Sequence, residues 1–441
     1  MSTLLSRISA REITVGVIGL GYVGLPLATA FADAGYHVIG FEIDEQKVRE
    51  LKAGRSYIPD VPATDVARLV SSGHLTGTTD FSLLSSCDAI SVCVPTPLGK
   101  SRDPDISYIV EATNRIVKHL RSGQVIVLES TTYPGTTIEV VKPALEAAGL
   151  KMGIDVFLSF SPERIDPGNS VFNVRNTPKI VGGVTPLCTE LAVALYSAIV
   201  DRVLPVSSPT AAEMVKLLEN TFRAVNIGLV NEVAIIAEKL GLDVWEIIEA
   251  AKSKPFGFMP FYPGPGLGGH CIPIDPQYLS WKLRMMNYRT RFIELADDIN
   301  SHMPDQVVDR VAMALNNIGE PKPMRGTKLL VLGVAYKRDI DDWRESPAIP
   351  VIVGLLSRGA VVDYQDDFVP KIDLAHGGDV PQPMYSVPLD YAAMSRYDAV
   401  VVVTDHQYFN VGLVLEHARR LVDTRNLTGT IGRGHPRVVK L

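Results

Sequence analysis

Short apolar runs rich in β-branched residues alternate along the chain with segments of helical apolar spacing. Residues 13–18 form the first run, residues 25–35 have helical spacing, and residues 37–44 form the next run. This order predicts a strand, a helix and a parallel strand in one βαβ unit. Further strands are expected at residues 89–94, 124–129 and 155–160, with crossover helices between them.

Polar residues follow the downstream ends of these later strands. Thr96 follows the first, Ser130 and Thr131 follow the second, and Glu163 follows the third. In open α/β sheets, ligands bind beyond the carboxyl ends of the strands. We therefore expect these side chains to converge on one crevice.

A long helix is predicted after the first α/β region. Ser208 is suited to cap its N-terminus and Pro209 to occupy its first position, and the helix is expected to continue to Gly241. This length is well beyond the mean of about 11 to 12 residues. A rod of this kind between two domains is often a subunit interface, so a homodimer or higher homo-oligomer is predicted.

A second α/β domain is predicted near the C-terminus, without the full glycine fingerprint. Its expected elements are a strand and glycine turn at 326–337, a helix at 346–358, and strands at 361–366, 398–405 and 420–426. Pro350 is expected to delay the start of that helix or to bend it. The predicted fold class is thus α/β, with an N-terminal Rossmann-type domain (1–206), a central long-helix region (207–318) and a C-terminal Rossmann-like domain (319–441).

Composition and charge narrow the class of protein. The 46% hydrophobic content, the net charge of -6 and the absence of a Lys/Arg run predict a globular protein without nucleic-acid or membrane partners. No signal peptide or membrane-spanning run is visible, so a cytoplasmic location is expected. The cysteines, Cys87, Cys93, Cys188 and Cys271, form no CxxC pair. Neither a disulfide framework nor a metal site is predicted.

The first strand is followed by the glycine pattern GLGYVG. Gly19, Gly21 and Gly24 fit GxGxxG between a strand and a helix, and Glu42 ends the second strand. Such glycines let a pyrophosphate approach a helix N-terminus, while the acid accepts both ribose hydroxyls and repels a 2′-phosphate. NAD is therefore predicted in preference to NADP. A tight turn without a ligand is the alternative.

One stripe of the predicted long helix is polar. Glu213, Lys216, Asn220 and Arg223 recur about one helical turn apart. A solvated face is the usual explanation of such a stripe. Alternatively, Lys216 and Asn220 point at a substrate oxygen as a pair of donors.

The segment GPGLGGHCIPIDP (264–276) is too rich in glycine and proline for regular structure, so it predicts a tightly defined loop around Cys271. Cys271 has three ordinary interpretations, as a small buried hydrophobic residue, as a metal ligand beside His270 or as an accident of sequence. No further ligand stands at suitable spacing for a metal. A rigid glycine loop also gives close access to a ligand, and Asp275 follows the cysteine by one helical turn.

Seven segments occur in the same order as in a known family. They are GLGYVG, ESTTYPGT, SPERIDPG, VKLLENTFRAVN, GPGLGGHCIPIDP, GVAYKRDIDDWRESP and VDTRN. Over nearly the whole chain the sequence resembles the nucleotide-sugar 6-dehydrogenases, which oxidise UDP-sugars to UDP-uronic acids. The resemblance implies an NAD domain, a helical dimer spine, a UDP-binding domain and a role in polysaccharide biosynthesis.

The resemblance also implies the site residues. The residues expected to contact NAD are Gly19, Gly21, Tyr22, Val23, Gly24, Glu42, Thr96, Thr131 and Arg344. Those expected to line the UDP-sugar site are Glu163, Arg164, Lys216, Asn220, Phe261, Lys337 and Arg425. Among the catalytic residues, Lys216 and Asn220 are expected to stabilise oxyanions at C6, Asp275 to assist proton transfer, and Glu163 and Thr131 to position water.

Cys271 explains why such an enzyme proceeds beyond an aldehyde. A thiolate that adds to the aldehyde forms a thiohemiacetal, which loses a second hydride to give a thioester that water cleaves. The loop is then constrained because the sulfur must reach C6 of the sugar opposite the nicotinamide. A two-electron hydroxyacid dehydrogenase is the nearest rival, and a nucleotide-sensing protein without chemistry is a more distant one.

The sequence around Cys271 indicates which sugar is the substrate. The loop reads GGHC and follows PFGFMPFYPGPG, which resembles the branch that acts on N-acetylated UDP-hexosamines. UDP-N-acetylglucosamine is the expected substrate, with UDP-N-acetylmannosamine and UDP-glucose as alternatives. The pocket for the N-acetyl group is not located by the sequence.

Overall fold

The computed structural model describes residues 2–99, 103–165, 171–269, 271–374 and 383–441. His270, which entered the argument about the sugar, lies outside the described residues. The chain forms two compact units, Met1–Glu219 with Gln277–Tyr288, and Asn220–Pro276 with Arg289–Leu441. The three predicted domain boundaries remain predictions.

The first unit contains an eight-stranded sheet in the order β3-β2-β1-β4-β5-β6-β7-β8. Its strands are β1 (Thr14–Ile18), β2 (His37–Phe41), β3 (Leu75–Thr78), β4 (Ala89–Val92), β5 (Gln124–Leu128), β6 (Val156–Phe160), β7 (Lys179–Gly183) and β8 (Val203–Val206). The pair β6–β7 is antiparallel and the other pairs are parallel. The predicted βαβ unit and the three later strands are confirmed, whereas β3, β7 and β8 were not predicted.

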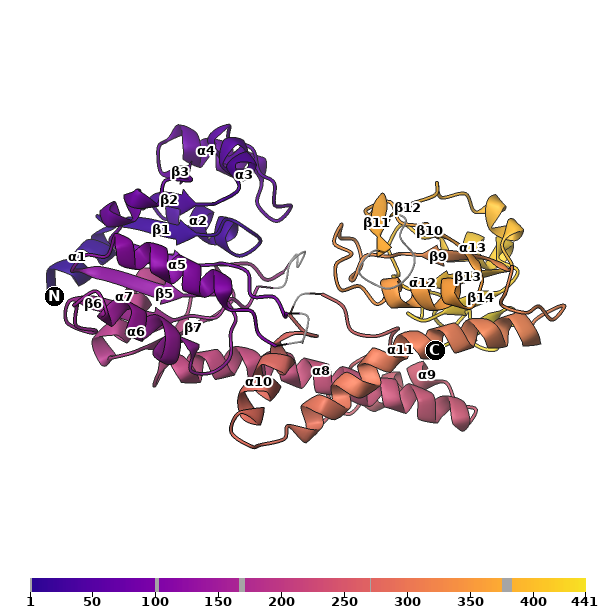
Figure 1. Cartoon of the computed structure of the whole chain (residues 1–441). Helices are drawn as coiled ribbons and strands as arrows, with labels where there is room; N and C mark the ends of the chain where they lie inside the picture. Colours follow the sequence, from indigo (N-terminus) through magenta and orange to yellow (C-terminus); the bar gives the residue numbers. More distant parts are fainter. Residues whose placement is uncertain (1, 100–102, 166–170, 270, 375–382) are drawn as a thin grey trace. The chain divides into compact units, whose positions relative to one another are not determined.

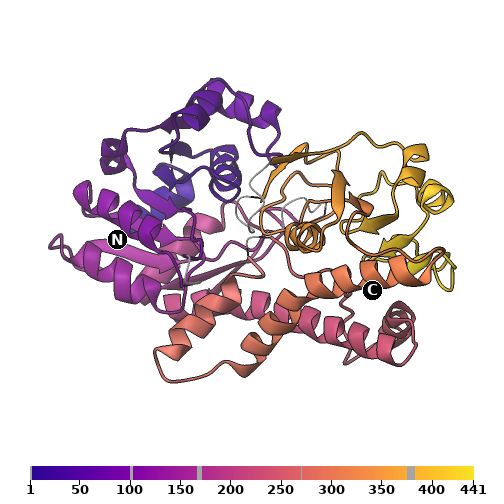
Figure 2. The ribbon, with the colours of Figure 1, turned by 45° about the vertical axis from the view of Figure 1, so that its right-hand side comes forward.

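Helices cover both faces of this sheet (Figure 1). One face packs against α1 (Ser2–Ala10), α2 (Gly24–Asp33), α4 (Ala63–Ser71) and α7 (Pro186–Tyr196). The other packs against α5 (Ser107–Lys118), the π-helical turn Thr137–Val141 and α6 (Lys142–Glu146), while α3 (Glu45–Lys52) lies beside β3 (Figure 2). Alternate residues of each strand enter the two cores, as expected for a sheet buried on both faces.

The second unit contains a five-stranded parallel sheet in the order β10-β9-β13-β14-β15. Its strands are β9 (Lys328–Leu332), β10 (Val361–Gln365), β13 (Ala399–Val402), β14 (Leu421–Asp423) and β15 (Val438–Lys440), and β11 (Lys371–Asp373) and β12 (Pro383–Tyr385) form a small separate sheet. Helices α11 (Arg291–Asn317) and α12 (Ala348–Ser357) cover one face, and α13 (Val411–His417) covers the other. The predicted second α/β domain is confirmed.

The later start of this helix, expected because of Pro350, is confirmed. Helix α12 begins at Ala348, so Pro350 lies in its first turn. The backbone N–H groups of a first turn have no partner within the helix, and proline therefore removes no helical hydrogen bond there.

The two large sheets open with the same turn. Gly19 after β1 has φ 87° and its N–H donates to the Phe41 carbonyl at the end of β2 (2.8 Å). Gly333 after β9 has φ 78° and donates in the same way to Gln365 at the end of β10 (2.9 Å). Both positions need a left-handed backbone, which glycine adopts without strain. The second domain thus repeats the opening turn although it lacks the full glycine pattern.

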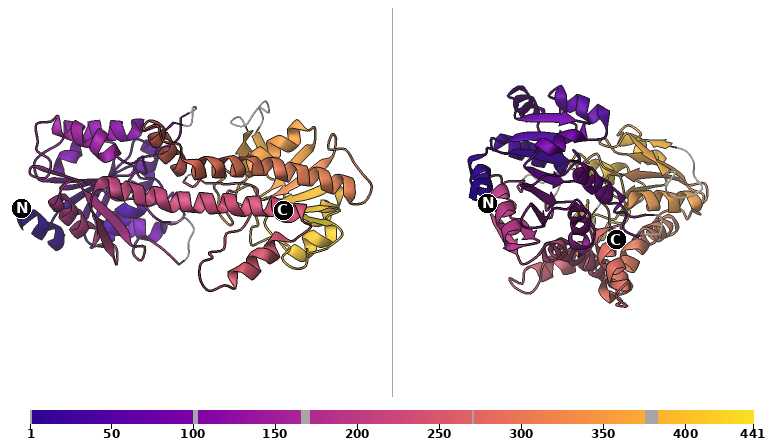
Figure 3. Two further views of the ribbon diagram at one scale, coloured as in Figure 1. Left: turned by 90° about the horizontal axis from the view of Figure 1, so that it is seen from below. Right: turned by 60° about the vertical axis from the view of Figure 1, so that its left-hand side comes forward.

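The predicted long helix is confirmed as α8 (Pro209–Lys239), which contains 31 residues. Its second half lies beside α11 (Figure 3), and there Gly228 permits the close approach. A Cβ at Gly228 would lie 3.2 Å from the Cα of Ala296. Within the described part of the chain, no helix is both long and apolar enough to cross a membrane.

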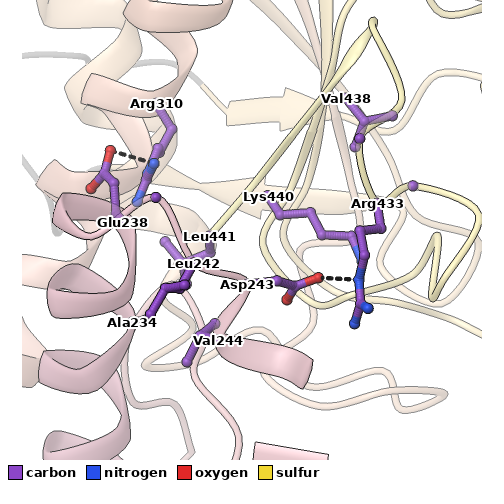
Figure 4. Close-up of a pocket in the computed structure, with 13 residues that line it drawn as sticks. Ala234, Glu238, Leu242, Asp243, Val244, Arg310, Arg433, Val438, Lys440 and Leu441 are labelled. Atoms are coloured by element: carbon purple, nitrogen blue, oxygen red, sulfur yellow. Dashed lines mark hydrogen bonds and ion pairs between the residues drawn. The ribbon is translucent and has the colours of Figure 1, made fainter. Parts of the chain in front are cut away.

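A cavity of about 340 Å³ lies between the end of α8, the start of α9 (Val244–Lys252) and residues 432–441 (Figure 4). Glu238 pairs with Arg310 of α11 beside it, and Asp243 pairs with Arg433 (2.9 Å). These ion pairs attach the end of α8 and the start of α9 to the second α/β domain. Such contacts are one reason why the end of α8 and the start of α9 belong to the second unit.

A buried amide pair joins α8, α11 and the glycine loop of the second unit. Asn231 donates through Nδ2 to Oδ1 of Asn300 (2.8 Å), and its own Oδ1 accepts the backbone N–H of Gly264 (2.9 Å). Asn300 in turn donates to the Ala224 carbonyl (3.1 Å). Both asparagines are buried, so these contacts fix where the glycine loop begins.

We expect Asn231→Ala to lower the free energy of unfolding by about 1 to 3 kcal/mol. The substitution leaves two buried groups unpaired, the backbone N–H of Gly264 and the side-chain amide oxygen of Asn300. Asn226→Ala on the same helix is the matched control, since Asn226 donates only along α8 to the Phe222 carbonyl (2.7 Å). Chemical denaturation of the three proteins measures the difference. Equal losses in the two variants would contradict the role assigned to Asn231.

Candidate active site

The three glycines of the first turn have three different surroundings. A Cβ at Gly19 would lie 2.6 Å from the Cys93 carbonyl oxygen, and one at Gly24 would lie 1.7 Å from the Gly19 carbonyl oxygen. At Gly21, by contrast, no described atom lies within 4 Å of the added Cβ. No described side chain caps the N-terminus of α2 either. Gly19 and Gly24 therefore close the turn, and the space at Gly21 fits an approaching pyrophosphate.

Glu42 lies beside this turn at the end of β2. Its carboxylate accepts the backbone N–H groups of Leu20 (3.0 Å) and Ile43 (2.8 Å) and is buried. The hydrogen bond to Leu20 holds the acid against the turn that would carry the pyrophosphate. This is the place at which a dinucleotide domain binds the adenosine ribose, and the structure fits NAD at this end of the sheet.

Thr96, Thr131 and Glu163 follow strands that are direct neighbours in the sheet, so they lie along one edge. The segment after β5 is held in place because Ser130 donates through Oγ to the Val94 carbonyl (2.8 Å). The segment after β4 is held by α10 (Asp275–Arg284), whose buried Tyr278 hydroxyl donates to the carbonyl of Thr96. The three residues thus follow neighbouring strands of one sheet, and their convergence on one crevice stays a prediction.

A buried lysine lies between two carboxylates at the same edge. Lys179, the first residue of β7, places Nζ 2.5 Å from Oε2 of Glu129 and 3.2 Å from Oε2 of Glu163. Tyr196 of α7 donates its hydroxyl proton to the other oxygen of Glu129 (2.5 Å). Neither Lys179 nor Glu129 was predicted as part of the site.

The environment of Glu163 favours its charged form. Its Oε1 accepts the backbone N–H groups of Arg164 (2.6 Å) and Ile165 (2.8 Å). Burial by itself raises the pKa of this carboxyl, but the Lys179 ammonium and these two N–H groups outweigh it, so the pKa is lowered. For Glu129 burial prevails and the pKa is raised.

The polar stripe of α8 is not a solvated face at its start. Glu213 is 1% exposed, and its carboxylate accepts the N–H groups of Gly135 (2.6 Å) and Thr137 (2.9 Å) and the Thr137 hydroxyl (2.6 Å). Lys216 is 9% exposed, whereas Arg223 lies at the surface. Burial raises the pKa of Glu213. Glu213 therefore anchors α8 to the loop after β5, one turn before Lys216.

Arg164, predicted to contact the substrate, has protein partners in this structure. It forms a two-pronged ion pair with Glu219 of α8, with donor–acceptor distances of 2.6 and 3.2 Å, and donates to the Pro178 carbonyl (2.6 Å). The residue after Glu219 is Asn220, which heads the second unit. Arg164 thus braces α8 at the step between Lys216 and Asn220.

Cys271 is an exposed thiol, whereas Cys87, Cys93 and Cys188 are buried. The interpretation of Cys271 as a buried hydrophobic residue was therefore wrong. Its carbonyl accepts the N–H groups of Ile274 (3.1 Å) and Asp275 (2.8 Å), which places the cysteine in the turn that starts α10. Within the same unit the Asn220 amide donates to the buried Asp275 carboxylate. The structure thus joins two of the predicted catalytic residues directly.

The glycines before Cys271 are required by their neighbours in the second α/β domain. A Cβ at Gly264 would lie 2.5 Å from the guanidinium of Arg425, and one at Gly268 would lie 2.9 Å from the Tyr336 side chain. At Gly269, with φ 88°, the Tyr336 ring would be equally close, at 2.9 Å. The loop is glycine-rich because its backbone passes directly over these two side chains.

Of the predicted substrate residues in this unit, Phe261 packs edge-on against Phe222 of α8, and Arg425 donates to the Val403 carbonyl (3.0 Å). Lys337 is half-buried on the segment after β9. Arg344, predicted to contact NAD, forms a two-pronged pair with Asp342, with both distances at 2.9 Å. Arg425 therefore lies under the glycine loop, while Lys337 and Arg344 remain predictions as ligand contacts.

Some residues that build the site carried little signal in the sequence. Glu129 and Lys179 are separated by 50 positions, and only the sheet order brings them together. Asn231 and Tyr336 act through contacts with a distant loop. Glu129 begins the segment ESTTYPGT, and the only signal for it in the sequence was its position directly after the apolar run 125–128.

Models of one enzyme family match most of the chain. The NAD binding domain of the UDP-glucose/GDP-mannose dehydrogenase family matches residues 13–200, its central domain matches 210–302, and its UDP binding domain matches 330–430. The UDP-N-acetyl-D-glucosamine 6-dehydrogenase of Pseudomonas aeruginosa is 34% identical over 93% of this chain and 94% of that relative. The NDP-N-acetyl-D-galactosaminuronic acid dehydrogenase of Ralstonia nicotianae is 35% identical over 94% and 96%.

Among solved structures, a UDP-D-ManNAc dehydrogenase from Pyrococcus horikoshii superimposes with a TM-score of 0.85. It is 32% identical, and the match covers 94% of this chain and 96% of that one. The printed names of these three proteins differ in the sugar.

The glycine turn yields a paired prediction. We expect Gly24→Ala to lower the free energy of unfolding by about 1 to 3 kcal/mol, because its Cβ overlaps the Gly19 backbone. Gly21→Ala should leave the stability of the cofactor-free protein unchanged but raise the Kd for NAD about tenfold or more, because the methyl group occupies the open space. Thermal unfolding and NAD titration measure both. Unchanged NAD affinity in Gly21→Ala would refute the assignment of that space.

Proposed function

The chain belongs to the UDP-glucose/GDP-mannose dehydrogenase family and is an NAD-dependent oxidoreductase, and from this premise we propose that it oxidises C6 of a UDP-sugar twice, from alcohol to carboxylate. The observation that carries the proposal is the exposed Cys271, presented by a glycine loop beside the Asp275–Asn220 contact. A two-electron dehydrogenase has no use for a nucleophile at this place. NAD, when bound, accepts the hydride in both oxidations.

The thiol supplies the step that lets oxidation continue. The Cys271 sulfur adds to the aldehyde carbon, and the aldehyde oxygen gains a proton, which gives a thiohemiacetal. Loss of a hydride and of the hydroxyl proton leaves a thioester. Water then attacks the thioester carbon, the carbon–sulfur bond breaks, and the acid leaves with Cys271 restored. Overall, one alcohol group and one water give one carboxylate, two hydrides that pass to NAD, and three protons.

Lys216 and Asn220 are suited to stabilise the oxygen at C6. Lys216 is 9% exposed, and among the described residues its ammonium has no hydrogen-bond or ion-pair partner. Asn220 donates one amide hydrogen to Asp275, and the second remains for the substrate, since an asparagine amide has two. Hydrogen-bond donors that are already oriented toward the position of a developing oxyanion stabilise the transition state most effectively.

Three further side chains are proposed to handle protons and water. Asp275, next to Asn220, takes the proton from the thiol or the substrate hydroxyl. Glu163 is held ionised and so is able to accept a proton from the attacking water, with Thr131 as a second contact for that water. For binding, we propose Gly19, Gly21, Tyr22, Val23, Gly24, Glu42, Thr96, Thr131 and Arg344 for NAD and Arg164, Phe261, Lys337 and Arg425 for the UDP-sugar.

We expect the enzyme to form two NADH for each UDP-sugar consumed, because the thioester route removes two hydrides. A limiting UDP-sugar is titrated while NADH absorbance and product mass are followed. Cys271→Ala should form no acid while it retains NAD binding, since Cys271 is exposed and its loss leaves no cavity in a core. One NADH per sugar with an aldehyde product, or undiminished acid from Cys271→Ala, would reject the proposal.

The sugar is proposed to be UDP-N-acetylglucosamine. The named relatives act on N-acetylated sugars, and the Pseudomonas aeruginosa protein, named for N-acetylglucosamine, is 34% identical. UDP-N-acetylmannosamine is the second candidate, since the Pyrococcus horikoshii structure carries that name.

UDP-glucose lacks the N-acetyl group and would leave a polar partner of that group unpaired. We therefore expect kcat/KM for UDP-glucose to be about tenfold to hundredfold below that for UDP-N-acetylglucosamine. The four sugars UDP-GlcNAc, UDP-ManNAc, UDP-GalNAc and UDP-glucose are compared under one set of conditions. Equal turnover of UDP-glucose would reject the N-acetyl assignment and leave the chemistry untouched.

We also propose a homodimer through α8. This helix exposes Phe222, Leu229 and Ile236, which recur seven residues apart and so lie along one strip, and the exposed Leu240 follows the helix directly. Leu229→Glu combined with Ile236→Glu should convert a dimer to a monomer in sedimentation velocity. A monomeric parent protein would reject the proposal. The cytoplasmic location stays a prediction.

A further inference from the structure

We infer that Lys179 is a positioning residue that holds the Glu163 carboxylate charged and aimed, and so extends the release of the acid product to low pH. The inference rests on the proposed function, in which Glu163 accepts the proton of the attacking water. It concerns a residue that does not itself reach the reacting atoms.

The geometry around Lys179 is that of one cation shared by two buried anions. The Lys179 side chain is 6% exposed, and those of Glu129 and Glu163 are 0% and 14% exposed. The ammonium lies nearer to Glu129 than to Glu163, at 2.5 and 3.2 Å. Glu163 is the more accessible of the two acids, so it is the one placed to meet water.

The two carboxylates differ in what else they contact. Glu129 accepts the Tyr196 hydroxyl, which in turn lies 3.4 Å from the Ser91 hydroxyl, so it is closed off inside the core. Glu163 keeps Oε2 for Lys179 while Oε1 takes two backbone N–H groups. Lys179 therefore connects an acid that is closed off in the core to one at the edge of the sheet.

The charged and titratable groups that face Glu163 come from several elements. Lys179 on β7, Glu129 after β5 and the buried thiol of Cys93 after β4 all act on it or on its lysine. The guanidinium of the adjacent Arg164 is already paired with Glu219 on α8. Among these described groups, Lys179 is thus the cation that compensates the charge of Glu163.

Structural stability alone is a weak reason for such a cluster. Taking an ammonium and two carboxylates out of water is costly, and apolar residues of similar size often serve a core equally well. One cation for two anions also leaves the cluster with a negative charge. A carboxylate that must stay ionised beside its substrate gives that arrangement a use.

The test compares Glu129→Gln with the double variant Glu129→Gln/Lys179→Met. The two proteins differ only in the cation and each keeps Glu163 as the single acid of the cluster. Acid release after the two-NADH burst is followed by rapid quench between about pH 5 and 9, a range that lies above the ordinary titration of glutamate. Lys142→Met, which removes a partly exposed lysine paired with Glu146, is the control.

We expect acid release by the parent protein, Lys142→Met and Glu129→Gln to be independent of pH down to about pH 5. In the double variant the loss of the cation should raise the pH at which Glu163 titrates by about one to three units, so that release slows below neutral pH. The size of the NADH burst should not change. A double variant with the pH profile of Glu129→Gln overturns the inference.

A second measurement, made without catalysis, separates an effect on Glu163 from the effect of a variant that folds poorly. Carboxyl carbon NMR of glutamate-labelled protein, with Glu163→Gln identifying the resonance, follows the titration of Glu163 itself. In Glu129→Gln this carboxyl should titrate at lower pH than in the parent, because a like charge has gone while Lys179 remains. An unchanged or higher titration point overturns the inference. Failure of the parent to form acid would instead reject the proposed function.

Discussion

The register of helix α8 is the constraint on which the site depends. The buried carboxylate of Glu213 holds three hydrogen bonds to residues 135–137, so α8 can neither rotate nor slide without leaving a buried anion unpaired. One turn later Lys216 projects from the same face, and one further turn on Asn220 meets Asp275. A rotation by one residue, about 100°, would turn both of these proposed donors to another direction.

Asn231 fixes the register of α8 in the second unit in the same way. It pairs α8 with Asn300 of α11 and with the first glycine of the cysteine loop. Both contacts are buried amide hydrogen bonds, which are directional as well as stabilising. One helix therefore carries the two proposed oxyanion donors, the partner of Arg164 and the anchor of the cysteine loop, each specified by a polar side chain.

Local sequence patterns were sufficient for much of this structure. The alternation of β-branched runs and helical segments predicted both sheets and α8, because strand and helix periods are properties of a short window. The glycine turn with Glu42 was readable for the same reason. Strands β7 and β8 were not predicted, and β7 runs antiparallel to β6, an arrangement that no short window specifies.

Contacts between distant segments account for what the sequence did not reveal. Lys179 is an unremarkable lysine in NTPKIVGG until β7 pairs with β6 and carries it to Glu129 and Glu163. The polar stripe of α8 was ambiguous because helical spacing groups residues without saying what faces them. The burial of Glu213 and Lys216 excludes a solvated face at the start of the stripe, and that burial depends on the whole first unit.

The passage of the glycine loop over Arg425 and Tyr336 limits how freely the chain can be recombined. Each of Gly264, Gly268 and Gly269 lacks a side chain because a particular residue of the second α/β domain occupies the space. The residues of the loop and of that domain therefore constrain each other, although a long helix separates them in the chain. A chimera that takes the second domain from a relative with a different residue at position 336 or 425 must also take the loop, or Cys271 will be presented from a displaced backbone.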